Sequence, residues 1–149
     1  MNTQDGIALT GKLTISLNDE IVQETENLVV TAGKEWVAAR MKDTSTVMTH
    51  MGIGTSTTAA AIGQTALVTE VARTALTTSG GTVAGAVITF ATTVPADTPD
   101  VTAPATAAIT EAGIFTAASA GTMLARTVFS AVNKGELDTM TISWAVTIS

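Results

Sequence analysis

Hydrophobic and polar residues alternate along most of the chain, which is the period of a strand with one buried face. The alternation is clearest near the C-terminus, over residues 138–148. One face there consists of Met140, Ile142, Trp144, Val146 and Ile148, and the other of Thr139, Thr141, Ser143 and Thr147. This pattern predicts a strand that buries one side, with Trp144 in the core.

The first 30 residues predict an opening hairpin over residues 7–30. Its first strand has one apolar face, formed by Leu9, Leu13, Ile15 and Leu17. Asn18-Asp19 supplies turn residues before a return strand from about Glu20 to Val30. Val22, Leu28 and Val30 share a face of that strand, which Glu24 and Glu26 interrupt. The two carboxylates predict an edge or solvent-facing strand, where charge blocks unwanted pairing.

The next segment is the one helix candidate, over residues 32–42. Thr31 stands where an N-cap belongs, and Trp36, Val37 and Met41 supply apolar contacts. A helix this short is expected to close one end of the core.

The remaining strands are expected within residues 46–149. Alternation from Val47 leads into Gly52-Ile53-Gly54 and a Thr-, Ala- and Gly-rich loop from Thr55 to Thr65. A second hairpin is expected over 72–79 and 83–94, with its turn at Gly80-Gly81. All three prolines lie in 95–105, which predicts a long polar loop. Two further strands are expected over 108–116 and 122–129.

These elements predict a single β-rich structural domain over residues 1–149. The fold class expected is all-β, an antiparallel β-sandwich or jelly roll of about eight strands with one short helix.

Composition points to a surface that packs against protein. Charged residues make up only 13% of the chain, against roughly 25% in an average soluble domain, and there are 30 Thr and 25 Ala. Contiguous surfaces with so little charge usually mark protein contacts. A net charge of −6 with scattered Lys and Arg argues against nucleic-acid binding. The charge-free stretch between Arg73 and Asp97 contains glycines and many threonines, so no membrane span is expected.

Candidate chemistry is sparse, and we expect neither an enzyme nor a cofactor. His50 is the only histidine, without the partners that a general base needs. The run from Gly52 to Thr57 lacks the third glycine of a dinucleotide site and the Gly-Lys-Ser/Thr of a phosphate loop. The carboxylates of Asp97 and Asp100 lack calcium-loop spacing, and without cysteine no thiolate site exists.

Several runs resemble small virion structural proteins of tailed bacteriophages. They are Asn27-Leu-Val-Val-Thr-Ala-Gly-Lys-Glu-Trp36, Met51-Gly-Ile-Gly-Thr-Ser-Thr-Thr-Ala-Ala60 with Gln64-Thr-Ala-Leu67 and Arg73, Ile109-Thr-Glu-Ala-Gly-Ile-Phe115, Gly121-Thr-Met-Leu-Ala-Arg-Thr-Val-Phe129 and Asn133-Lys-Gly-Glu-Leu-Asp-Thr-Met-Thr-Ile-Ser-Trp144. The resemblance implies a virion component: a capsid decoration (cement) protein, or a neck, baseplate or tail-fibre part.

Physical arguments favour capsid decoration among these. The chain shows no repeats or heptads of a fibre shaft, and negative charge suits the capsid exterior better than its DNA-facing lumen. The expected partners are the major capsid protein or other virion proteins, with several copies of the chain or a homo-oligomer. A receptor- or carbohydrate-binding module remains an alternative, which predicts an exposed aromatic platform.

Two sets of residues are predicted to matter most. Polar segments that lack internal partners are free to order on a neighbour, so partner contacts are expected at Met1, Asn2, Thr3 and Gln4 and at Asp97, Thr98, Pro99, Asp100 and Val101. Glu111 and Arg126 lie in strands expected to be neighbours, and an inward Glu–Arg pair would fix their register.

Overall fold

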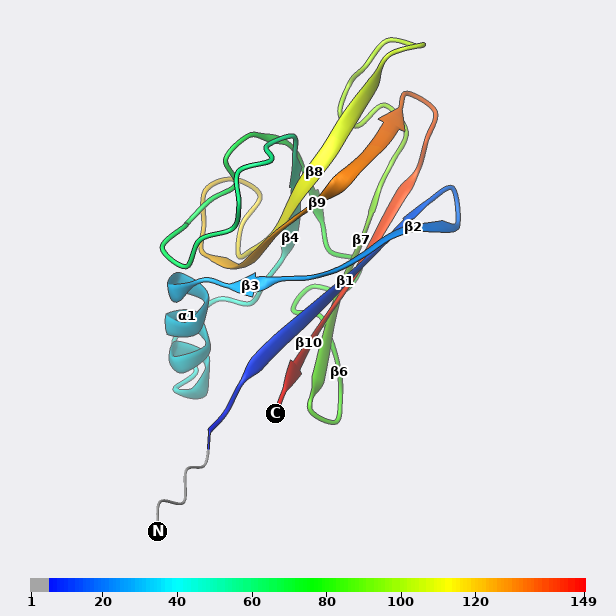
Figure 1. Cartoon of the computed structure of the whole chain (residues 1–149). Coiled ribbons are helices and arrows are strands. Elements are labelled where there is room, and N and C mark those ends of the chain that lie inside the picture. The colour runs from blue at the N-terminus through cyan, green and yellow to red at the C-terminus, as the bar shows by residue number, and fades with distance from the viewer. Residues whose placement is uncertain (1–5) are drawn as a thin grey trace.

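The computed structural model describes residues 6–149, and within them ten strands form two five-stranded antiparallel sheets (Figure 1). The sheets pack as a β-sandwich, which confirms the predicted fold class. Ten strands rather than about eight are present because β3 (Leu28–Val29) and β6 (Thr82–Ala84) are too short to show a period of two.

The first sheet has the order β2-β1-β10-β7-β6. β2 spans Glu20–Glu26, β1 Leu9–Leu17, β10 Met140–Ile148 and β7 Val87–Val94. Leu13 pairs with Trp144, which pairs in turn with Phe90. These three buried side chains therefore form one row across the sheet, and Trp144 is fully buried in the core as predicted.

The second sheet has the order β3-β9-β8-β4-β5. β9 spans Met123–Gly135, β8 Thr106–Phe115, β4 His50–Gly54 and β5 Glu70–Ala75. The main core lies between the two sheets and includes Ile53, Ile114 and Leu124 from this one. A smaller cluster of Val30, Leu67, Phe115 and Met123 lies apart from it.

The opening hairpin forms, but its return strand differs from the prediction. Asn18 and Asp19 both have positive φ, as a two-residue hairpin turn requires, and β2 is an edge strand as expected. The chain then leaves the first sheet at Asn27, and β3 pairs with β9 in the second sheet. The register of β2 also shifts opposite Ile15 and Ser16, which leaves Val22 unpaired with β1 and exposed. Val30 follows β3 and is fully buried in the smaller cluster.

The predicted second hairpin over 72–79 and 83–94 is wrong. β5 pairs with β4 in the second sheet, while β7 forms a hairpin with the short strand β6. Gly80 and Gly81, both at positive φ, carry the chain from one sheet to the other, and Gly85 lies in the hairpin turn itself. Local turn residues indicated a reversal there without indicating which strands pair.

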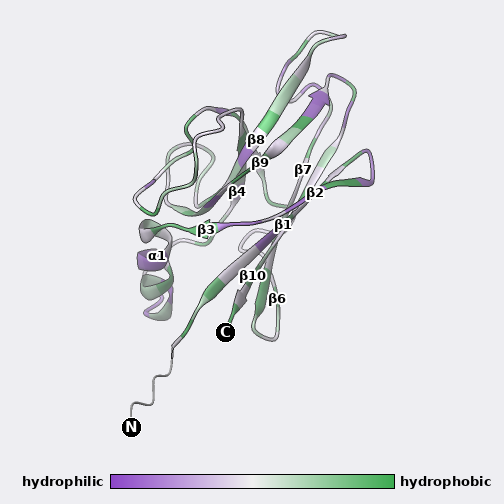
Figure 2. Ribbon diagram, viewed as in Figure 1, coloured by the Kyte–Doolittle hydropathy of each residue, from purple (hydrophilic) through white to green (hydrophobic). Residues whose placement is uncertain are grey.

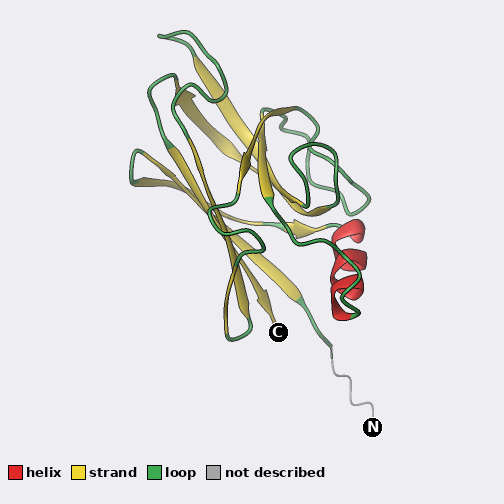
Figure 3. Ribbon diagram, turned by 180° about the vertical axis from the view of Figure 1, so that it is seen from behind, coloured by secondary structure: helices red, strands yellow, loops and turns green. Residues whose placement is uncertain are grey.

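The helix α1 spans Thr31–Met41 and lies at one end of the sandwich, near the start of the described chain (Figure 3). Trp36 and Val37 pack against the core as predicted. Two details differ: Val30 precedes the helix with no side-chain cap, and Met41 is 85% exposed. Within residues 6–149, no helix has both the length and the apolar character to cross a membrane.

Candidate functional site

The buried polar chemistry of the chain centres on Glu111 of β8 and Arg126 of β9. The Arg126 Nη2 lies 2.7 Å from the Glu111 Oε2, and both side chains are fully buried. The register shifts between Ile109 and Glu111, so Glu111 pairs with Val128. Ala112 and Ile114 point into the main core, so the alternation of the strand places Glu111 on the opposite face of the second sheet.

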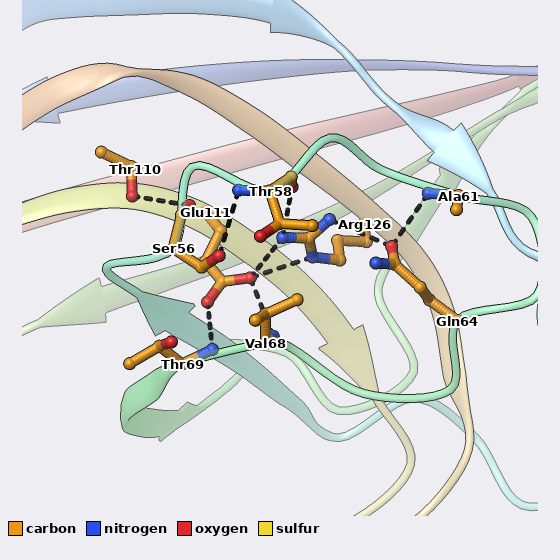
Figure 4. A network of polar contacts seen from close by, with 9 residues as sticks. All are labelled: Ser56, Thr58, Ala61, Gln64, Val68, Thr69, Thr110, Glu111 and Arg126. Carbon is orange, nitrogen blue, oxygen red and sulfur yellow. Dashed lines mark hydrogen bonds and ion pairs between the residues drawn. The ribbon is translucent and has the colours of Figure 1, made fainter.

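Residues 55–69, here called the covering segment, lie over that face (Figure 4). Glu111 accepts hydrogen bonds from the backbone N–H groups of Val68 (3.1 Å) and Thr69 (2.7 Å). Arg126 donates to the carbonyl oxygen of Thr58 and to the side-chain oxygen of Gln64. The ion pair therefore holds both ends of the covering segment. Leu67 of this segment packs on Phe115 and Met123 of the second sheet.

This placement changes the interpretation of the pair. The sequence predicted that Glu111 and Arg126 lie in neighbouring strands and that their side chains point inward. The two strands are neighbours. The two side chains, however, lie beneath the covering segment and outside the main core. A buried ion pair is favourable only when its remaining hydrogen-bonding groups are satisfied. Here the partners are mostly backbone groups of the covering segment, and backbone amides leave no signal in a sequence.

Arg73 of β5 makes a second, more open set of contacts. Its guanidinium binds Glu70 at 2.6 Å and donates to the carbonyl oxygens of Ala117 and Ala120. It also lies 3.6 Å from the centre of the Phe115 ring, as in a cation–π contact. Arg73 thus joins the edge of the second sheet to the loop between β8 and β9.

The loop over 95–105 is tied to the turn between β9 and β10. The buried Lys134 Nζ donates to the carbonyl oxygen of Pro95 at 2.8 Å, and burial lowers the pKa of this amine. The Asp97 N–H donates to the Glu136 carbonyl oxygen, and the Glu136 carboxylate accepts from the Ala103 N–H. The loop therefore has internal partners, contrary to the assumption behind its predicted role.

The predicted partner-contact residues divide into two groups. Met1, Asn2, Thr3 and Gln4 lie outside the described residues. In the loop, Asp97 and Asp100 are exposed, whereas Thr98, Pro99 and Val101 are half-buried. The loop thus presents two carboxylates to a neighbour, together with the exposed uncharged residues Pro95, Thr102, Ala103, Pro104 and Ala105.

The outer face of the first sheet is a second candidate surface. Pairing aligns its outward residues in four rows across β1, β10 and β7: Thr10, Thr147 and Val87; Lys12, Ala145 and Thr89; Thr14, Ser143 and Ala91; and Ser16, Thr141 and Thr93. All of them are partly or fully exposed. Lys12 is the one charged residue among the twelve, so the part of this face on β1, β10 and β7 is small-sided and carries a single charge. The face continues onto the edge strand β2, where Glu26 and Glu24 pair with Lys12 and Thr14.

Candidate catalytic groups remain isolated among the described residues. The His50 Nδ1 lies 2.8 Å from the hydroxyl of its neighbour Thr49. That hydroxyl donates to the carbonyl oxygen of Thr116, so it belongs to the sheet contacts. Within residues 6–149, no three His, Asp or Glu side chains come together as a metal site would require.

Comparison of the chain with protein-family models, with curated proteins and with solved structures finds no match.

Proposed function

We propose that this chain is a structural protein of a tailed-phage particle, a capsid decoration protein that stabilises the shell through protein–protein contacts and has no enzymatic role. The resemblance of several sequence runs to virion proteins motivates the assignment to a phage particle. The outer face of the first sheet is the structural observation that supports a role in protein packing. The part of this face on β1, β10 and β7 consists mainly of short Thr, Ser and Ala side chains. Such side chains lose little conformational entropy when another protein covers them.

The distribution of polar groups supports the same role. The buried ionisable side chains Glu111, Arg126 and Lys134 bind segments of their own chain. Each contact fixes a loop on the sandwich, which gives a rigid body with preformed surfaces. Rigid partners pay less entropy on assembly.

Binding to particles tests the proposal. The purified chain is added to particles that lack it, and the amount that cosediments with the particles is measured. We expect the wild type to bind, and Ser143→Lys to bind at least tenfold less, because an unpaired ammonium would be buried in the contact. Ser130→Lys, an exposed position of β9, is the matched control and should bind like the wild type.

The outcomes separate two claims. A wild-type chain that stays in the supernatant with these particles would contradict the virion role. Equal binding of Ser143→Lys and wild type would leave that role standing and overturn the assignment of this face.

A further inference from the structure

The charged residues are distributed unequally between the two ends of the sandwich. β1, β7 and β10 each run from one end to the other, and nine residues of β1 span roughly 30 Å. One end, here called the acidic end, carries the β1–β2 turn, the loop over 95–105 and the β9–β10 turn (Figure 1). Its carboxylates are Asp19, Glu20, Asp97, Asp100, Glu136 and Asp138, against the one buried ammonium of Lys134.

The acidic end also presents apolar side chains. Ile21 is 63% exposed beside the β1–β2 turn, and Leu137 is 84% exposed in the β9–β10 turn. Asn18 joins the two turns, because its amide donates to the Asp138 carboxylate and its side-chain oxygen accepts from the Thr139 N–H. Two exposed apolar residues are thus held on a rigid support and surrounded by carboxylates.

The opposite end carries an apolar depression beside α1, here called the helix groove. Its shared walls are Leu9, Val37 and Ile148, with Ile7 and Met41 on one side and Val83 and Val87 on the other. Figure 2 shows hydrophobic ribbon at the start of β1 and beside the turn between β6 and β7 at this end. The charged residues that line the groove are both basic, Lys34 and Arg40.

We infer that the acidic end of one copy of this chain docks into the helix groove of a second copy. Ile21 and Leu137 would enter an apolar lining, and Asp19 and Glu20 would face Lys34 and Arg40. The two surfaces lie at opposite ends of the same strands, so the acidic end of a molecule cannot reach the helix groove of that same molecule. The contact is therefore head-to-tail, which builds a ring where the rotation closes and a filament where it does not.

Arg40 is partly engaged already, which makes Lys34 the better test. Arg40 donates to the Ser45 carbonyl oxygen and lies 3.6 Å from Asp43. Lys34 is exposed and has no ion-pair partner within 4 Å among the described residues. Its charge is available to a neighbour.

This contact would be one way in which the proposed structural protein assembles, so it rests on the proposed function. Its test uses the purified chain alone, without particles. Sedimentation velocity is measured over a range of protein concentrations at low salt. We expect reversible self-association that weakens as salt is added. Lys34→Glu and Glu20→Lys should each weaken it about tenfold or more, since each places like charges across the contact.

Mixing the two variants gives the decisive result. In the mixture, the altered groove of Lys34→Glu faces the altered end of Glu20→Lys, and the two unaltered surfaces also match. The mixture should therefore associate more strongly than either variant alone. Lys42→Glu, an exposed reversal outside the groove lining, is the control and should associate like the wild type. Unchanged melting temperatures would show that all three variants fold.

Three results would overturn the inference. They are a monomeric wild type at every concentration, single reversals that associate normally, and a mixture that fails to associate. If the wild type is monomeric while a chain beginning at Gly6 associates, residues 1–5 of the same chain occupy the groove instead. In each case particle binding can still be observed, so the proposed function is tested separately.

Discussion

At the scale of single residues, Glu111 and Arg126 hold the covering segment on the second sheet. Removing one partner of a buried ion pair leaves the other charge uncompensated and costs about 3–5 kcal/mol. Glu111→Ala also leaves the N–H groups of Val68 and Thr69 without their acceptor. We therefore expect Glu111→Ala to lower the free energy of unfolding by at least this amount, as measured by urea denaturation.

The exposed pair of Lys12 and Glu24, 3.7 Å apart, is the matched control. Glu24→Ala should cost less than about 1 kcal/mol, because solvent screens such pairs. Adding Arg126→Met to Glu111→Ala should recover part of the loss by removing the buried charge. Unchanged stability of Glu111→Ala would contradict the structural role of the pair.

Asp138 makes the stability of the protein depend on pH under acidic conditions. Hydrogen bonds from the Asn18 amide and the Gly135 N–H lower the pKa of this carboxyl below its ordinary 3.8. The folded state thus favours the carboxylate, and the resulting stability is complete above the unfolded pKa and is lost as pH falls through the folded pKa.

We accordingly expect the stability difference between wild type and Asp138→Asn to be constant above about pH 5 and to shrink as the pH falls below the ordinary pKa. Urea denaturation at a series of pH values measures this difference. A difference that persists unchanged at the lowest pH would show that the carboxylate is not the source.

At the scale of elements, the helix is positioned by a glycine. Gly33 of α1 is buried against β9, and an added Cβ would overlap the carbonyl group of Leu124. Helix propensity alone favours Gly33→Ala by about 1 kcal/mol. Because the backbone of β9 cannot easily move, we expect the opposite sign, a loss of about 1–3 kcal/mol in thermal or urea denaturation.

Ala38→Gly, at an exposed position of the same helix, is the reference. It should cost about 1 kcal/mol from propensity alone. A stabilised Gly33→Ala would mean that α1 does not approach β9 as closely as described.

The sequence predicted those elements whose own residues carry the signal. β1 and β10 bury alternate residues, so their periods were clear, and the two carboxylates of β2 indicated an edge strand. The destinations of β3, β5 and β6 were not predicted, because pairing between distant strands depends on contacts that no local pattern contains. Gly80-Gly81 indicated a turn, but a crossing between sheets and a hairpin use the same residues.

The candidate surfaces were predicted less well than the fold. The Glu111–Arg126 pair could be anticipated from two oppositely charged residues in otherwise apolar strands. Its backbone partners in the covering segment could not be anticipated. The same holds for the loop over 95–105, whose composition suggested a free segment although Lys134 and Glu136 anchor it.

At the scale of the whole molecule, the sandwich presents three surfaces suited to neighbours: a sheet face of mostly small side chains, an acidic end and a groove lined by two basic residues. We propose that the sheet face contacts the shell and that the two ends contact other copies of the chain. Under this proposal, the charges at the two ends would orient neighbouring copies, because electrostatic complementarity contributes specificity.

The number of copies of this protein in purified virus particles shows whether it is a structural component of the particle. Quantitative mass spectrometry of particles washed free of unbound protein measures that number against the major capsid protein. We expect many copies per particle, which are lost when the outer surface of the capsid is stripped of its bound proteins. Particles that contain none would contradict this structural role.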